Sequence, residues 1–375
     1  MAQAYTPGLT VTSHVRHREE RVLPILGEVL VKRGDRVKAQ QVVARTLMPG
    51  NVVPINVAKL LSVSPPELPR FMLKKKGDAI EVGTVIARNN GIFGFFWKEY
   101  HSEAHGVIES ISPITGQVIV RGDPIKIEVK AYLAGDVVEV IPDSGIVVEA
   151  DVSLVQGIFG IGGEAYGPIV IATDEHETEL AIHHIDSNMQ GAIVVAPGRA
   201  TVAAIHHAIE VGVSAIVAGG IDDADLKDLL GYDLGVAITG SEKIGLTLIV
   251  TEGFGDIAMA KRTFELFRSR QGHMAACNGA TQIRAGVMRP EIVISLTAEE
   301  VLTEKESHPI HGFLNLGTPV RVIRDPYFGL LGSISNLPTE PQLLDSGSKA
   351  RVLEVELIDG RKLVVPRANV ELIEG

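Results

Sequence analysis

The chain of 375 residues has one cysteine, few aromatic residues and no long apolar run. A single cysteine excludes a disulfide framework, a cysteine-held zinc ribbon and a thiolate-held iron–sulfur cluster. Apolar runs stay under about ten residues, well short of the roughly 20 that a membrane-spanning helix needs. The first 20 residues lack the apolar stretch of a secretory signal. We therefore expect a cytoplasmic protein without membrane insertion.

Charge is distributed unevenly, although hydrophobic residues (45%) and charged residues (22%) have ordinary globular proportions. Residues 1–100 carry 15 Lys and Arg against 8 Asp and Glu, whereas residues 101–375 carry 20 against 38. A basic N-terminal part beside an acidic remainder indicates either an internal electrostatic match or a basic surface for an anionic partner such as nucleic acid.

A segment near the N-terminus is duplicated. Residues 30–45 align without gaps on residues 73–88, and seven of the sixteen positions are identical. Each copy predicts short strands around a Gly-Asp turn, because glycine takes positive φ readily and aspartate hydrogen-bonds its local backbone. The offset of 43 residues predicts two related half-barrels in one β domain over residues 1–150.

The duplicated segment resembles the barrel-sandwich hybrid of biotinyl and lipoyl domains, and the related hybrid domains of the Rnf electron-transport C subunit and RNA polymerase. Residues 105–118 are similar to a further strand pair of that fold. Biotinyl and lipoyl domains modify a hairpin lysine within Met-Lys-Met or Asp-Lys-Ala, and the chain contains neither sequence. The resemblance therefore implies a docking module, and we predict no cofactor.

Basic and aromatic residues accompany the second copy. Five aromatic residues fall within residues 93–100, close to a run of three lysines. Such side chains bind a partner protein, stack on nucleic-acid bases or form local core. Proline-rich residues 63–69, which precede this copy, predict an extended spacer. The candidates for partner binding here are Lys74, Lys75, Lys76, Phe95, Phe96 and Trp97.

Apolar strands alternate with amphipathic helices from residue 168 onward. This order predicts a Rossmann-like, mostly parallel α/β domain over residues 151–297. No dinucleotide-binding or P-loop fingerprint follows any of its strands, and no catalytic residue is assigned. The expected strands are residues 169–172, 192–196, 215–218, 236–239 and 246–251, and the expected helices are residues 200–211, 222–230 and 256–270.

Glycine and small polar residues follow these strands, where ligands of wound α/β sheets bind. Backbone N–H groups and arginine side chains there would hold an anion such as phosphate. Acidic residues at the same junctions favour the opposite interpretation, in which they cap helices and pair with the arginines. The anion-binding candidates are Gly198, Arg199, Thr201, Gly219, Gly220, Thr251, Gly253, Gly255, Arg284 and Arg289.

Histidine is frequent between residues 176 and 207, but none of these residues has the spacing of a metal-binding motif. Adjacent histidines point in different directions on a helix, so at most one of each pair would face a shared site. We expect packed or solvated histidines and predict no metal site. Cys277 has no neighbouring histidine that would support a nucleophile.

Residues 315–375, after an acidic linker at residues 298–314, predict a small β barrel. An alternating strand at residues 320–323 and a Phe-Gly turn resemble the KOW motif of NusG-type elongation factors, which implies an SH3-like barrel. Its 7 basic and 8 acidic residues give no basic stripe for phosphate contacts. We therefore favour a protein contact over RNA, with Tyr327 and Phe328 as candidates.

Together these features predict a non-catalytic scaffold or adaptor of a bacterial-type cytoplasmic assembly, linked to transcription, translation or a multi-subunit enzyme. Two alternatives remain open. One is a sensor or enzyme for a phosphate-containing ligand, with its site at the strand ends. The other is an RNA-binding protein that uses the basic N-terminal domain and the C-terminal barrel.

Overall fold

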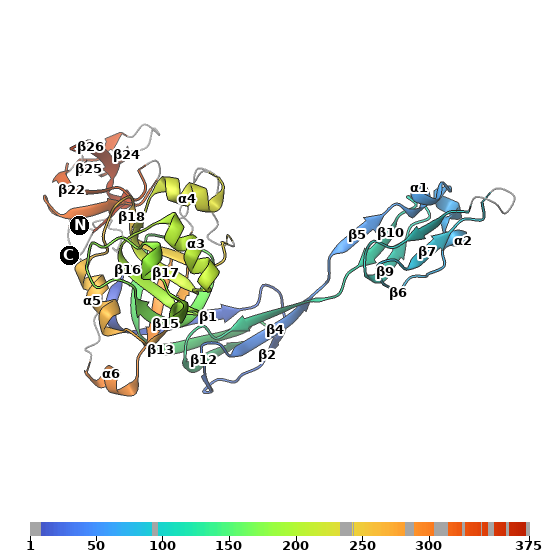
Figure 1. The fold of residues 1–375 in the computed structure, drawn as a ribbon, viewed down its shortest axis with the longest axis horizontal. Helices are drawn as coiled ribbons and strands as arrows, with labels where there is room; N and C mark the ends of the chain where they lie inside the picture. The colour runs from blue at the N-terminus through green and yellow to red at the C-terminus, as the bar shows by residue number, and fades with distance from the viewer. Residues whose placement is uncertain are drawn as a thin grey trace.

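The computed structural model is elongated, with a large body at one end and a small module, residues 52–121, at the other (Figure 1). We call residues 52–121 the distal module. None of the helices in the described part of the chain is both long and apolar enough to cross a bilayer. The structure describes residues 9–91, 97–232, 242, 244–281, 289–303, 314–324, 327–338, 340–343, 349–357 and 360–372.

The body is built around a mixed sheet of eleven strands. The sheet follows the order β14 (Phe159–Ile161), β18 (Thr247–Phe254), β17 (Ala215–Ile221), β16 (Ile193–Ala200), β15 (Glu164–Ile171), β19 (Met274–Asn278), β20 (Glu291–Ser295), β13 (Gly145–Gln156), β12 (Gly135–Ile141) and β3 (Arg36–Val37), and β1 (Val11–Val22) pairs along β13. Strands β15 to β18 are parallel, and the other pairs are antiparallel. The parallel strands expected here are confirmed, but the expectation of a mostly parallel sheet is wrong, because the sheet as a whole is mixed.

Both faces of the parallel strands are buried. Val194 and Ala196 of β16 belong to one core and Ile193 and Val195 to another, because successive side chains point to opposite faces. The first core packs against the helices that follow β16 and β17, and the second against the helix that follows β18. These helices are α3 (Val202–Val211), α4 (Asp223–Leu230) and α5 (Lys261–Ser269), and the expected strand at residues 236–239 lies outside the described residues.

The distal module has its own core and its own sheets. The strands are β5 (Val52–Ile55), β10 (Val118–Arg121), β9 (Gly106–Ile111) and β6 (Ala79–Ile80) in one sheet, with β7 (Val85–Arg88) paired to β8 (Glu99–His101), and the helices are α1 (Val57–Leu61) and α2 (Leu68–Phe71). The extended spacer expected at residues 63–69 is wrong, because Pro65 and Pro66 begin a 3-10 turn, η1 (Pro65–Glu67), that leads into α2. The fixed φ of proline suits the first turn of a helix.

The duplication extends well beyond the sixteen aligned residues. Strand β4 (Val42–Met48) pairs with β11 (Ile125–Lys130) in the same register as β7 with β8, including the bulge, and β4 also pairs with β2 (Glu28–Val29). Strand β3 pairs with β12 as β6 pairs with β9. Each copy thus has a full set of strands, more than the two half-barrels expected. We call residues 18–48 together with 125–149 the proximal copy.

Both copies use the same turn. Gly34 in the proximal copy and Gly77 in the distal module have φ of +91°. The aspartate after each glycine accepts the backbone N–H three residues before it, at 2.8 Å in the proximal copy and 2.9 Å in the distal module. The Gly-Asp pair therefore fixes the same local geometry in two different surroundings.

Two short segments join the distal module to the body, and we call them the waist. Residues 49–51 lead from β4 to β5, and residues 122–124 return from β10 to β11 (Figure 1). The Gly122 N–H donates to the Asn51 carbonyl oxygen at 2.9 Å. A Cβ on Gly50 would lie 2.1 Å from the Gly122 carbonyl oxygen, so only glycine fits this crossing. The distal module is an insertion between β4 and β11.

The C-terminal part forms a five-stranded antiparallel sheet around a separate core, beside the end of β18 (Figure 1). Its order is β26 (Lys362–Pro366), β25 (Val352–Leu357), β22 (Leu331–Asn336), β21 (Pro319–Val322) and β27 (Val370–Leu372). The shorter elements are the pair β23 (Gln342–Leu343) and β24 (Lys349–Ala350), the helix α6 (Ala298–Thr303), and the 3-10 turns η2 (Ile182–His184), η3 (Ser187–Met189) and η4 (Arg367–Asn369). Helix α6 occupies the start of the expected linker.

Candidate functional site

The structure brings the predicted anion-binding residues of three strands to one edge of the parallel sheet. The register pairs Arg199 of β16 with Gly220 of β17, and Gly220 with Gly253 of β18. The hydroxyl of Thr251, a residue that is 2% exposed, donates to the Ala218 carbonyl oxygen at 3.4 Å. Sequence reasoning located this edge because parallel strands all end on the same side of a sheet.

The chain itself fills the space over the glycines of this edge. A Cβ on Gly219 would lie 2.4 Å from the backbone nitrogen of Met259, and one on Gly220 would lie 2.6 Å from the carbonyl oxygen of Gly255. Gly255 has φ of +105°, which lets the chain turn back across the strand ends. Residues 255–259 therefore pass over the edge, and the helix expected from residue 256 begins only with α5.

Gly198 is packed in the same way, since a Cβ there would lie 2.4 Å from the Thr178 carbonyl oxygen. Gly253 has φ of +148°, and its Cβ would lie 2.9 Å from the carbonyl oxygen of Gly329 in the C-terminal part. At this edge glycine serves close approach of backbone to backbone.

Arg199, the cation expected to hold an anion, is paired with carboxylates. Its Nε donates to Glu179 at 3.0 Å, and its guanidinium also contacts Asp222. The hydrogen bond that Arg199 donates to the Glu179 carboxylate raises the pKa of Arg199 above its usual value. Thr201 accepts the N–H of Ala204 at 3.2 Å and so caps α3. This geometry corresponds to the alternative in which arginine neutralises acidic residues at the helix starts.

The C-terminal part covers the same edge through buried charges. Glu252, at the end of β18, accepts a hydrogen bond of 2.6 Å from Arg321 of β21, which also donates to Glu371 of β27 at 2.8 Å. Arg289, another anion candidate, lies 2.7 Å from a Glu371 oxygen. Arg321 and Glu371 are 2% and 1% exposed, and charges so deeply buried are stable only in such pairs. These ion pairs at the strand ends join the body to the C-terminal part of the same chain.

Aromatic contacts reinforce this junction. The Phe328 ring centroid lies 6.3 Å from that of Phe254, which lies 5.3 Å from that of Phe159. Phe328, a partner-binding candidate, therefore packs on the body of its own chain. Tyr327 is 37% exposed. Arg284 lies outside the described residues.

The other partner-binding candidates lie on the distal module. Lys75 and Lys76 are exposed and Lys74 is half-buried, whereas Phe95 and Phe96 lie outside the described residues. Trp97 is 56% exposed, and the Arg88 guanidinium carbon lies 5.1 Å from its ring centroid. The large apolar side chains that are more than half exposed on this module also include Leu60, Leu73, Val82 and Ile114.

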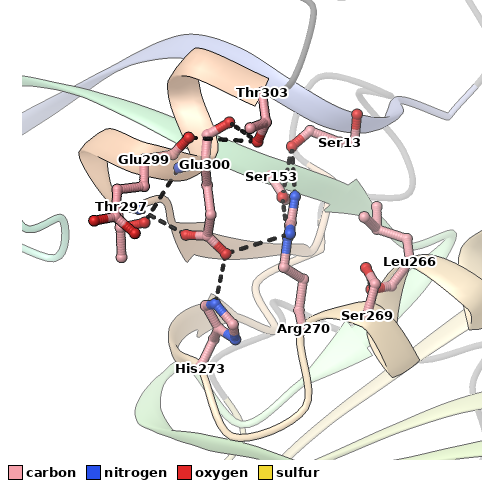
Figure 2. Close-up of polar contacts among 10 residues, drawn as sticks. All are labelled: Ser13, Ser153, Leu266, Ser269, Arg270, His273, Thr297, Glu299, Glu300 and Thr303. Atoms are coloured by element: carbon pink, nitrogen blue, oxygen red, sulfur yellow. Dashed lines mark hydrogen bonds and ion pairs between the residues drawn. The ribbon is translucent and has the colours of Figure 1, made fainter.

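A partly buried polar network attaches α6 to the body (Figure 2). Glu300 accepts hydrogen bonds from the Thr297 N–H at 2.8 Å and from Arg270 at 3.4 Å, and its carboxylate lies 2.7 Å from His273 Nε2. Arg270 Nε donates to Ser153 at 3.0 Å. The Ser153 hydroxyl donates its own hydrogen to the Ser13 carbonyl oxygen at 2.7 Å, so it faces no base that would make it a nucleophile. We therefore interpret this network as structural, because it fastens α6 to the body.

One cluster was missed by sequence reasoning. His17 and Glu19 alternate on β1 and share a face with Glu291 at the start of β20, and one ligand atom of each lies within 4.8 Å of the others. Burial raises the pKa of Glu291. The alternation of polar residues along β1 was a usable signal, but the pairing of β13 with both β1 and β20 is not encoded locally.

Comparison with known proteins gave no relative: none of the family models, curated proteins or solved structures matches this chain. The resemblances to hybrid and KOW barrels therefore remain predictions. Function is inferred from the contacts described above.

Proposed function

We propose that this chain is a non-catalytic adaptor of a bacterial-type cytoplasmic assembly linked to transcription, translation or a multi-subunit enzyme. In this proposal the distal module is a barrel-sandwich hybrid that docks on a partner protein. The body is a Rossmann-like frame, and the C-terminal part is an SH3-like KOW barrel. The observation that supports the proposal most strongly is that the distal module stands away from the body on the waist with a core of its own (Figure 1).

The surface of the distal module favours a protein partner. Trp97 is 56% exposed, and Leu73, next to the lysine run, is 55% exposed. Exposed tryptophan and leucine beside basic residues are typical of protein-binding surfaces. Residues 52–121 carry 8 Lys and Arg against 6 Asp and Glu, which is little excess charge for binding nucleic-acid phosphates.

The geometry at the strand ends supports the adaptor over a phosphate sensor or enzyme. Arg199 and Arg289 both pair with carboxylates, and backbone from residues 255–259 packs against the glycines. An added phosphate would have to displace the partly exposed Glu179 from Arg199, or the buried Glu371 from Arg289 at a cost in buried charge. The C-terminal part adds a further cover over the same edge.

The test uses the full chain as bait in its native cell, with Leu73→Asp and Trp97→Asp combined on the distal module. Leu26→Asp on the body, at a side chain that is 74% exposed, is the matched control. We expect the double variant to lose at least about 10-fold of a partner protein that the wild type and the control retain, because a charged side chain disfavours an apolar interface. Equal thermal stability of the three proteins shows that they fold alike.

Undiminished recovery with the double variant would contradict the proposal. Recovery that disappears after ribonuclease treatment would support RNA binding instead. Stabilisation of the chain by phosphorylated metabolites, lost in Arg199→Ala, would support the sensor or enzyme.

A further inference from the structure

The cluster of His17, Glu19 and Glu291 lies where the body's sheet curls on itself. Strand β1 pairs with one edge of β13, and β20 pairs with the other edge. Arg21 of β1 nevertheless donates to both carboxylate oxygens of Glu164 in β15, at 2.8 and 2.9 Å. Strands β1 and β15 therefore come together although three strands separate them in the sheet order, and the side chains of the cluster converge inside the curl.

The local charges do not balance among the side chains alone. Arg21 is bound at both of its terminal nitrogens to Glu164, and it lies 3.6 Å from a Glu19 oxygen. Glu19 and Glu291 thus share one neighbouring imidazole, whose Nε2 lies 3.5 Å from Glu19 and makes no hydrogen bond within the described residues. Burial alone would lower the pKa of His17, but the neighbouring carboxylates raise it above its usual value, and a divalent cation would take the place of the proton that they favour.

A buried, unpartnered hydroxyl marks the same place. Tyr132 is 5% exposed, and its hydroxyl makes no hydrogen bond of standard length among the described residues, although it lies near enough to the Glu291 carboxylate to oppose the rise in the pKa of that group. Its electrostatic neighbours are the carboxylates of Glu291, Glu19 and Glu164. Burial, followed by these carboxylates, raises the pKa of Tyr132 well above its usual value, so the hydroxyl keeps its proton. A buried hydroxyl without a partner is costly unless water or a bound group satisfies it.

The fold does not need polar residues here. In the distal module, β5 pairs with β10 as β1 pairs with β13, and the register places Val53 and Ile55 where the proximal copy has Glu19 and Arg21. Ile55 belongs to the core of the distal module, whereas Val53 is 40% exposed. The polar set of the proximal copy is therefore an addition to a barrel that folds without it.

Solvent reaches the cluster. The side chains of His17 and Glu19 are 19% and 24% exposed. A groove of about 400 Å³ lined by Glu20, Arg21 and Glu164, among others, lies next to the Arg21–Glu164 pair and includes none of the three cluster residues.

We propose that His17, Glu19 and Glu291 bind one divalent first-row transition metal ion such as Zn²⁺, beside the Tyr132 hydroxyl. An imidazole with two carboxylates suits Zn²⁺ better than Mg²⁺, which prefers oxygen ligands and retains water. Three protein ligands leave a coordination position for solvent, as in metal sites that are not purely structural. This site is independent of the adaptor function proposed above.

The test is calorimetric titration of the full chain with Zn²⁺ and, separately, with Mg²⁺. We expect one equivalent of Zn²⁺ to bind, and its affinity to fall at least about 100-fold in His17→Ala and in Glu19→Gln, since each loses a ligand. Glu20→Gln is the matched control because Glu20 is the exposed neighbour on the opposite face of β1. Mg²⁺ should bind at least about 10-fold more weakly than Zn²⁺.

Two results would overturn the metal site. One is the absence of saturable Zn²⁺ binding by the wild type. The other is equal binding by the wild type, His17→Ala and Glu19→Gln, which would place the ion elsewhere, for example on the histidines between residues 176 and 207. If His17→Ala does not fold, the isosteric Glu19→Gln and the absorption spectrum of added Co²⁺ decide, because a d–d band reports a His/carboxylate site.

Discussion

The proximal copy and the distal module have the same strands, turns and register, but their surroundings differ. Val37, Val43 and Val137 of the proximal copy correspond to Ile80, Ile86 and Ile108 of the distal module, and all are buried. The proximal copy then continues into the eleven-stranded sheet through β12 and β13. The distal module ends its pairing at β5 and adds two short helices.

This difference distinguishes the features that both copies share from the features that depend on the strands next to each copy. The buried apolar positions and the Gly-Asp turns are shared, so they are what the fold requires. The polar cluster includes Glu19 of the proximal copy, together with the preceding His17 and with Glu291 of β20 in the body. A module that stands on the waist has an exposed surface for partners, whereas one built into a sheet gains residues from neighbouring strands.

The largest expected loss of unfolding free energy comes from glycine substitutions, each of which acts on one of the two copies. The equivalent residues Gly135 and Gly106 begin β12 and β9, and an added Cβ would lie 2.3 Å from the Glu149 carbonyl oxygen and 2.1 Å from that of Arg121, respectively. Each substitution to alanine should cost about 3 kcal/mol of unfolding free energy, because backbone must move. Hydrogen exchange should show lost protection across the body for Gly135→Ala, and only within residues 52–121 for Gly106→Ala.

Loss of protection throughout both parts in either variant would show that the two copies unfold as one unit. Leu60→Ala, at a side chain that is 51% exposed, is a suitable control and should leave exchange in both parts unchanged.

An intermediate loss of unfolding free energy is expected when the hydrogen-bond network that attaches α6 to the body is disrupted. Burial alone would raise the pKa of Glu300, but hydrogen bonds from Thr297 and His273 outweigh it and lower the pKa below its usual value. The stabilisation is therefore complete above the unfolded-state pKa of about 4.3, and is lost as pH falls through the lower folded-state value. Glu300→Gln should cost about 1.5 kcal/mol at neutral pH, measured by denaturant unfolding.

The difference between wild type and Glu300→Gln should shrink as pH falls through the lowered folded-state pKa of Glu300, because both side chains are then neutral. A difference independent of pH would mean that the carboxylate charge does not stabilise α6. Exchange in the distal module should not change, which again separates the two regions.

The smallest expected losses of unfolding free energy are those at the two Gly-Asp turns, and we expect the two losses to be equal. Gly34 and Gly77 have the same φ, and nothing lies within 4 Å of an added Cβ at either position. Gly34→Ala and Gly77→Ala should each cost about 1 kcal/mol, from the positive φ alone. Local exchange near each turn measures this, and costs that differ by more than about 1 kcal/mol would show that the surroundings alter the turn.

Local patterns predicted the parts of the fold that depend on neighbours in sequence. The alternation of β16, α3, β17 and α4 follows from apolar periodicity, and the Gly-Asp turns follow from the conformational freedom of glycine. The short helices at residues 65–71 were missed because two prolines suggest extended chain as readily as a first helical turn.

The candidate site was harder to predict, since its character depends on long-range contacts. The Gly219-Gly220 pair resembles a ligand-binding junction in sequence, but its neighbours are residues 255–259 of the same chain. Nothing near Glu252 in sequence indicates Arg321 as its partner. The convergence of Glu291 with His17 likewise requires knowing that β1 and β20 flank the same strand.

The hairpin formed by β7 and β8 occupies the place in the distal module that β4 and β11 occupy in the proximal copy. The position between Arg88 and Glu99 in the distal module therefore corresponds to the position in the proximal copy at which the distal module is inserted. A further copy inserted there would have the same relation to the distal module that the distal module has to the proximal copy. Foreign domains grafted between Arg88 and Glu99 would extend the same architecture by one more link.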